Sequence, residues 1–285
     1  MKGIEKLREK LPDYQGKKIY RFNLIALIVF LSSLGFQLIL DSLPRIFPEI
    51  RIFQNLAPFT PVFGSLFIVS VGFLIVYNFW RAREKKLNRN KEKAYQASFI
   101  FVATGIPMVI SVIIHSIFPS DFIIPNQNKE SLSWFLTRPL TDYFNEYSLI
   151  FFYLRLLIFI VFLVLGLIMA VKSLKTFGID YMALVYVYYP EESTLQNHEI
   201  YSILRHPTYH GLLMIGIGSI FLRCSIYSFI FLLIFFIGIN LHLKFVEEKE
   251  LIRRFGESYK NYKKEVPAFF VKLKNLRKYL RFIFR

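Results

Sequence analysis

A series of apolar blocks about 20 residues long constrains this chain more than any other feature. Crossing about 30 Å of hydrocarbon takes roughly 20 helical residues at 1.5 Å per residue. Such blocks lie at residues 22–40, 59–80, 97–118, 148–171, 208–222 and 226–246. With 54% hydrophobic residues, the chain is also too apolar for an ordinary soluble domain. The sequence therefore predicts an all-α, polytopic membrane helical bundle of about six transmembrane helices.

The basic residues are distributed unevenly between the two sides of this predicted bundle. The chain has 36 Lys and Arg residues. Thirty of them lie in the two terminal segments and in the connections that follow the second and fourth spans. Five lie in the connections that follow the first, third and fifth spans, and Arg155 lies inside the fourth span. The positive-inside rule then places both termini in the cytoplasm. The net charge of +16 is explained by this topology, with attraction to anionic lipid as a second role. No nucleic-acid-binding module accompanies the charge, so nucleic acid is not an expected partner.

Metal and disulfide chemistry have little support in the sequence. Cys224 is the single cysteine, so neither an intramolecular disulfide nor a cysteine-based metal cluster can form. His206 and His210 are four residues apart, but no HExxH pattern accompanies them. The first 21 residues are charged and contain no apolar core, so no cleavable signal peptide is expected.

The chain divides by composition into two regions. Residues 1–171 hold an N-terminal cytoplasmic segment and four spans, and the first three spans carry little polar chemistry. Residues 81–93 form a charged connector, and 119–147 form the longest outer loop. Arg155 is either a functional residue or a side chain that extends to the outer interface.

Residues 172–285 contain most of the polar residues that could perform chemistry. The Tyr-rich stretch from Tyr181 to Tyr189 is expected to be interfacial or extended. Pro207 then opens a short fifth span of about 15 residues, since proline is favoured in a first helical turn. Because only Arg223–Ser225 separates it from the sixth span, the two are predicted to form a tight hairpin that returns to the cytoplasm, where a C-terminal helical segment follows.

Two polar clusters flank this hairpin on the same side of the membrane. Residues 205–211 (RHPTYHG) enter it, and Glu247 and Glu248 leave it. A hairpin that returns to its starting face brings these clusters together, with cations and an imidazole facing carboxylates. Helical spacing also predicts that the acids share a face with Asn240. The hairpin glycines at 211, 216 and 218 are expected to allow close helix packing.

These residues resemble a known family. The segment YSILRHPTYHG from Tyr201 to Gly211 is similar to the RHPxYxG signature of isoprenylcysteine carboxyl methyltransferases and phospholipid methyltransferase-like membrane enzymes. The segment EEKELIRRFGESYKNYKKEVP from Glu247 is similar to the family's second motif. The resemblance covers roughly residues 172–270. One departure is Glu199, where the family often has glycine.

The resemblance implies that S-adenosylmethionine binds near the cytoplasmic side and that a lipophilic acceptor enters from the bilayer. The implied cofactor-binding residues are His206, Tyr209, Gly211, Glu247, Glu248 and Tyr262, and the implied catalytic residues are Arg205 and Glu247. Arg205 or His206 suits the cofactor's carboxylate, whereas the glutamates suit its ammonium and sulfonium. Tyr259 and Tyr262 are expected to close the pocket.

Methyl transfer requires a nucleophile, methyl and sulfur in line, with water excluded. An anionic acceptor needs no base, whereas an amine or hydroxyl would use His206 or a glutamate. Prenylcysteines, phospholipid amines, small thiols and other lipids all remain open as acceptors. Two alternatives also remain, namely a sterol-type reductase that uses a nicotinamide cofactor and a non-enzymatic transporter or scaffold.

Overall fold

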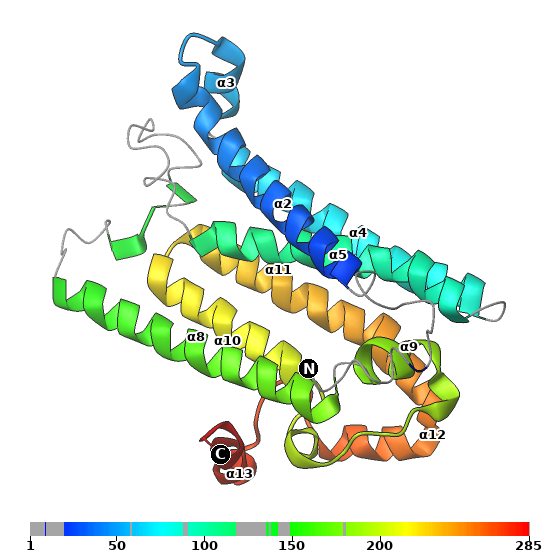
Figure 1. Ribbon diagram of the computed structural model, residues 1–285. Helices are drawn as coiled ribbons and strands as arrows, with labels where there is room; N and C mark the ends of the chain where they lie inside the picture. Colours follow the sequence, from blue (N-terminus) through cyan, green and yellow to red (C-terminus); the bar gives the residue numbers. More distant parts are fainter. Residues whose placement is uncertain are drawn as a thin grey trace. The chain divides into compact units, whose positions relative to one another are not determined.

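The computed structural model consists of helices joined by turns and irregular segments. It describes residues 9, 20–57, 59–87, 91–117, 135–136, 138–141, 149–178 and 181–284. Within these ranges there is no β-strand, and the long helices follow the apolar blocks of the sequence (Figure 1). The predicted all-α bundle is therefore confirmed.

The long helices match the predicted spans closely. They are α2 (Arg21–Ile46), α4 (Thr60–Leu87), α5 (Lys91–Ile117), α8 (Leu149–Phe177), α10 (Pro207–Arg223) and α11 (Ile226–His242). Among the described residues, five helices are long and apolar enough to cross a membrane, with α11 and the following polar helix counted as one run to Glu265. Helix α10 has 17 residues, slightly more than predicted.

The shorter elements connect or follow these helices. They are α3 (Arg51–Leu56), the π-helix η3 (Tyr181–Val185), α9 (Tyr186–Tyr188), the 3-10 turns η4 (Pro190–Glu192) and η5 (Glu199–Ser202), the π-helix η6 (Leu243–Glu247), α12 (Glu248–Glu265), η7 (Leu273–Asn275) and α13 (Leu276–Phe284). Residues Tyr181–Tyr188 are thus helical, so the extended alternative for this stretch is wrong. The charged segment 81–93 is also mostly helix, because α4 continues to Leu87 and α5 begins at Lys91. Most of the predicted outer loop 119–147 lies outside the described residues.

The chain forms two compact units. The first contains residues 1–14, 157–218 and 232–285, and the second contains residues 15–156 and 219–231. The predicted functional boundary at 171/172 coincides with none of the four boundaries between these units, and it stays a prediction about function.

The second unit contains a buried polar network that the sequence analysis missed. His115 Nε2 lies 2.8 Å from Asp41 Oδ2, and its Nδ1 lies 3.0 Å from the hydroxyl of Tyr227. The same hydroxyl lies 2.6 Å from Ser65 Oγ, which donates to Gln37 Oε1 at 3.0 Å. All five side chains are nearly or fully buried. The expectation that the first three spans carry little polar chemistry is therefore wrong, because single polar residues from several helices meet in one cluster.

In the first unit, the hairpin packs closely against α8. A β-carbon on Gly211 would lie 2.7 Å from the carbonyl oxygen of Gly166, so the two backbones approach directly (Figure 1). A β-carbon on Gly216 would meet the side chain of Leu232 on α11 at 2.6 Å, and one on Gly218 would meet Phe162 at 2.9 Å. The predicted packing role of these glycines is confirmed.

The C-terminal helix also belongs to the core of the first unit. Tyr279 and Ile283 of α13 are buried in a cluster with Met169 of α8 and Leu204. His210 Nε2 lies 2.7 Å from the hydroxyl of Tyr279, which ties α13 to the first turn of α10. The C-terminus thus supports the segment that precedes the hairpin.

Candidate functional site

The entry motif is held by the chain that follows α12. The backbone N–H of Arg205 donates to Pro267 O at 2.9 Å, and that of His206 donates to Ala268 O at 3.2 Å. Pro207 then begins α10, as its position in the first helical turn predicted. Two segments about 60 residues apart in sequence are therefore joined side by side at the motif.

The exit motif lies on a π-helical turn. Residues Leu243–Glu247 form η6, and α12 begins at Glu248. Such turns add a residue to the helical repeat and are frequent at functional sites. Asn240 is exposed, and its amide donates to Phe236 O at 2.7 Å. The prediction that it shares a face with the acids is wrong, because the π turn changes the helical register between them.

Glu248 is the most heavily bonded residue of the site. Its Oε1 accepts hydrogen bonds from Arg205 Nε at 3.1 Å and Nη2 at 2.7 Å, and lies 3.4 Å from His206 Nε2. Its Oε2 lies 2.6 Å from Lys263 Nζ. Only 7% of its side chain is exposed. Glu248 therefore joins the entry motif to α12 through a buried ionic cluster.

Glu247 has fewer partners and a more open side chain. Its Oε2 accepts a hydrogen bond from the Tyr209 hydroxyl at 3.1 Å, and its Oε1 lies 3.5 Å from His206 Nδ1. His242 Nε2 lies 4.0 Å from Oε2. Because 22% of the Glu247 side chain is exposed, this carboxylate can still accept a bond from a bound cation.

Electrostatics favour a charged form of both His206 and Glu248. Burial by itself lowers the pKa of His206, but the carboxylates of Glu247 and Glu248 outweigh it, and the net pKa lies above its usual value. Burial likewise opposes ionisation of Glu248, but hydrogen bonds from His206 and Lys263 and the charge of Arg205 hold its pKa well below the usual range. An imidazolium can donate to both carboxylates at once.

Arg205 and Tyr262 act mainly as tethers in this structure. Besides its bonds to Glu248, Arg205 donates through Nη1 to Lys263 O at 2.8 Å and to Val266 O at 2.6 Å. Four of its five N–H groups are thereby occupied. The hydroxyl of Tyr262 donates to Tyr201 O at 2.5 Å. Both residues hold the C-terminal segment against the entry motif, and the proposal that Arg205 is catalytic stays a prediction.

The sequence analysis missed Tyr186 and Arg254. Arg254 donates through Nη1 to Tyr186 O at 2.7 Å, and its guanidinium lies 4.7 Å from the centre of the Tyr186 ring. Burial and then the carboxylate of Glu247 raise the pKa of the Tyr186 hydroxyl, so the tyrosine shares the surroundings of Glu247. Tyr186 lies in the short helix α9, before η4, and is outside both sequence motifs.

Tyr259 presents a hydroxyl that a ligand can satisfy. Its side chain is 1% exposed, and its hydroxyl has no hydrogen-bond partner among the residues that the structure describes. Burial and then the charge of Glu248 raise the pKa of this hydroxyl, which therefore stays protonated. Buried hydroxyls are normally bonded, so an unpaired donor beside two carboxylates fits a polar ligand better than an apolar core.

Three further predicted residues lie outside this cluster. Gly211 contacts α8, as described above. Glu199, at the place where the resemblance expects glycine, has φ = 46°, a left-handed conformation that glycine adopts most easily. Arg155 is buried, and its Nη1 lies 3.5 Å from Thr141 Oγ1, which agrees with a side chain directed toward the outer interface.

The described part of the chain contains no group of three His, Cys, Asp or Glu that could hold a metal ion.

Residues 154–258 match the model of the phospholipid methyltransferase family. No curated protein and no solved structure matches the chain. The matched region runs from α8 through the entry motif and the hairpin to Glu247 and Glu248. It supports a membrane methyltransferase over the reductase and transporter alternatives. Residues 154–258 are thus similar to the phospholipid methyltransferase family, and they lie in a chain whose long apolar helices are those of an integral membrane protein.

Proposed function

We propose that the chain is a membrane methyltransferase that uses S-adenosylmethionine and acts on a lipophilic acceptor. The observation that carries this proposal is the partly exposed carboxylate of Glu247, bonded by Tyr209 and flanked by His206 and His242. The family match of residues 154–258 supports methyl transfer, and the site supports a cationic, polar cofactor.

S-adenosylmethionine supplies a methyl group on a positively charged sulfur, together with an ammonium and a carboxylate. Glu247 is the residue best placed to bind the positive groups, since Glu248 is enclosed by its own cationic partners. The buried Tyr259 hydroxyl is free to donate to a polar atom of the cofactor. Arg205 has one unoccupied N–H for the cofactor's carboxylate, and both ring nitrogens of His206 already face glutamates, so either residue can contribute only a limited contact. Arg205 is therefore proposed as a positioning residue.

The charge state of His206 bears on which acceptors are suitable. A raised pKa favours an imidazolium, which cannot accept a proton. An acceptor that is already anionic, such as a carboxylate, thiolate or phosphate, needs no proton removal. The site therefore favours an anionic acceptor over a neutral hydroxyl.

An aromatic path supports a lipophilic acceptor. The Phe269 ring lies 6.3 Å from the His206 ring and 6.1 Å from Phe236 on α11, and Phe236 lies 6.2 Å from Phe270. Phe270 is 63% exposed. A row of neighbouring aromatic rings thus links the imidazole to the exposed Phe270, against which acyl or prenyl chains can pack.

The proposed topology has both termini in the cytoplasm, so that the site opens to the compartment that contains the cofactor. Cysteine-accessibility labelling on intact cells tests this arrangement. In a Cys224→Ser background, a cysteine introduced at Lys274 is expected to react only after the membrane is permeabilised. Reaction in intact cells with an impermeant reagent contradicts it.

The central experiment follows a labelled methyl group into fractionated membrane lipids, prenylcysteine analogues and small thiols. Glu247→Gln keeps the shape of the side chain but removes its charge, and Tyr259→Phe removes only the hydroxyl. Both are expected to weaken S-adenosylmethionine binding by about tenfold or more, because a hydrogen bond to a charged group contributes roughly 1.5–3 kcal/mol. Glu257→Gln, at an exposed carboxylate paired with Lys260, is the matched control.

Calorimetry on the purified proteins measures the affinity, and thermal unfolding checks that each variant is folded. Unchanged affinity in both variants contradicts the proposed pocket. Absence of label in every fraction, with stabilisation by NADPH but not by S-adenosylmethionine, contradicts methyl transfer and supports the reductase alternative.

A further inference from the structure

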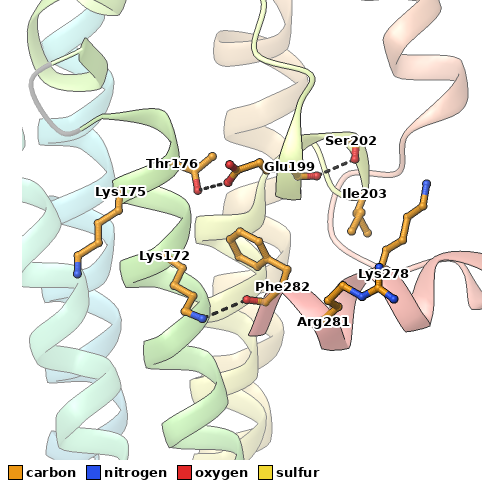
Figure 2. Close-up of a pocket in the computed structure, with 9 residues that line it drawn as sticks. All are labelled: Lys172, Lys175, Thr176, Glu199, Ser202, Ile203, Lys278, Arg281 and Phe282. Atoms are coloured by element: carbon orange, nitrogen blue, oxygen red, sulfur yellow. Dashed lines mark hydrogen bonds between the residues drawn. The ribbon is translucent and has the colours of Figure 1, made fainter. Parts of the chain in front are cut away.

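A cavity of about 610 Å³ lies in the first unit, and none of the site residues named above lines it. It is enclosed by the end of α8, the turn at Glu199–Ser202 and the C-terminal helix α13 (Figure 2). Its volume is within the range of roughly 300–1,000 Å³ that is typical of small-molecule sites. Nothing in the proposed transfer of a methyl group uses it.

The cavity is strongly basic. Four cationic side chains line it, namely Lys172, Lys175, Lys278 and Arg281, against the single carboxylate of Glu199. Figure 2 shows Lys175 on α8 at one wall and Lys278 on α13 at the other. A phosphate group, which carries negative charge and several acceptor oxygens, is the ligand that such a set of donors prefers.

Two of the charged residues already have structural partners. Lys172 Nζ donates to Phe282 O at 3.1 Å and to Ile283 O at 2.8 Å, the last turn of α13. Glu199 Oε2 accepts a hydrogen bond from Thr176 at 3.2 Å. These bonds connect all three walls of the cavity.

The other three cations are available to a ligand. Lys175, Lys278 and Arg281 are exposed, and none has an ion-pair or hydrogen-bond partner in the described part of the chain. Three positive charges with no protein counter-ion therefore surround one cavity.

The cavity also lies at the edge of the predicted membrane region. Helix α8 is a predicted span, and Lys172 and Lys175 are in its last two turns. Helix α13 buries Tyr279 and Ile283 but leaves Leu276, Leu280 and Phe284 exposed among its basic residues. Amphipathic helices of this kind, with apolar and basic faces, lie in the interface of anionic membranes.

We propose that this cavity binds the phosphate of an anionic phospholipid headgroup. The lipid's acyl chains follow the exposed apolar residues of α13 and α8, its phosphate is bound by Lys278 and Arg281 on α13, and Lys175 at the rim adds to the positive charge. A bound headgroup thus joins α8 to α13, and it acts independently of the proposed methyl transfer.

The test uses the full chain purified in mixed micelles of phosphatidylcholine and phosphatidylglycerol, with bound lipid counted by native mass spectrometry. The test variant combines Lys175→Gln, Lys278→Gln and Arg281→Gln. The matched control combines Lys264→Gln, Lys274→Gln and Arg277→Gln, which removes the same charge from exposed residues that do not line the cavity. Each basic residue near an anionic surface contributes about fivefold to binding.

The test variant is expected to bind phosphatidylglycerol at least about tenfold more weakly, whereas the control stays near the wild type. Thermal unfolding in phosphatidylcholine alone verifies that the test variant and the control variant are folded. If the triple test variant is not folded, the single variant Arg281→Gln takes its place. Equal losses in test and control overturn the proposal, because they indicate non-specific attraction to the membrane. Displacement of the lipid by glycerol phosphate at equal concentration also overturns it, in favour of a soluble phosphate compound.

Discussion

Arg205 and Glu248, 43 residues apart in sequence, form a buried ion pair in which Nη2 and Oε1 are 2.7 Å apart. This pair connects the segment before the hairpin to the helix after it. The neighbouring Glu247 is more exposed and has fewer partners. Two adjacent glutamates thus have different surroundings: Glu248 joins the entry motif to α12, and Glu247 keeps a partly exposed carboxylate.

Removal of one partner of this pair is expected to destabilise the protein strongly. Arg205→Met removes one of the three cationic partners of the buried Glu248 carboxylate, and breaking a buried ion pair typically costs about 3–5 kcal/mol. Arg253→Gln breaks an exposed contact with Glu250 and is expected to cost less than about 1 kcal/mol. Chemical denaturation in detergent measures both free energies of unfolding, and equal values contradict a structural role for Arg205.

The stability of the site should depend on pH in two directions. The raised pKa of His206 means that its contribution is complete below its unfolded value of about 6.5 and is lost as the pH rises through the folded value. The depressed pKa of Glu248 means that its contribution is present above its unfolded value of about 4.3 and is lost as the pH falls. Both contributions are therefore complete between about pH 5 and 6.

The measurement compares unfolding temperatures of the wild type with His206→Gln and Glu248→Gln at pH values below, within and above this range. The difference between wild type and His206→Gln should shrink as the pH rises above the unfolded pKa of about 6.5, and it should be lost once the pH passes the raised pKa of the folded protein. A difference that does not change with pH contradicts the charged imidazole.

Gly211 should tolerate no side chain. The β-carbon of Gly211→Ala would meet the backbone of α8 at 2.7 Å, so the helices must separate, and overpacking of this kind costs about 1–3 kcal/mol. Gly35→Ala in α2 has no atom within 4 Å of the new β-carbon and should be neutral or slightly stabilising. Thermal unfolding of the two variants separates packing from helix propensity, and similar shifts would refute the packing role.

Glu199 is expected to be strained by its left-handed backbone. Glu199→Gly and Glu199→Ala both lose the bond from Thr176, but only glycine relieves the positive φ. The glycine variant should therefore be more stable than the alanine variant by about 1 kcal/mol. Equal unfolding free energies would show that the loop relaxes without strain.

The buried hydroxyl of Tyr227 is expected to contribute to the stability of the second unit. Tyr227→Phe removes its contacts with Ser65 and His115 and should cost about 1–2 kcal/mol. Tyr153→Phe, at a ring that is 62% exposed, is the control and should have little effect. Unfolding curves followed by tryptophan fluorescence measure the free energy of unfolding of both variants. If Tyr227→Phe has the same free energy of unfolding as the wild type, the network does not stabilise the protein.

Much of the site could be predicted because its residues lie at the two ends of one hairpin. The order of Pro207, the apolar runs and Arg223–Ser225 indicates two short helices that return to one side. Contacts such as Tyr209 with Glu247 follow from that return. The division of roles between Glu247 and Glu248 could not be predicted, because it depends on the π turn and on where Lys263 and Arg205 meet the carboxylates.

The sequence by itself determined the membrane class, the number and position of the long helices, and the two polar motifs. Those features depend on local hydrophobicity and spacing, which each segment carries alone. Only the tertiary structure decided that Asp41, His115 and Tyr227 form one network, that Tyr259 has an unpaired buried hydroxyl, and that Lys175 and Arg281 line one cavity. These relationships join residues more than 100 positions apart, and burial and distance between such residues exist only once the helices pack.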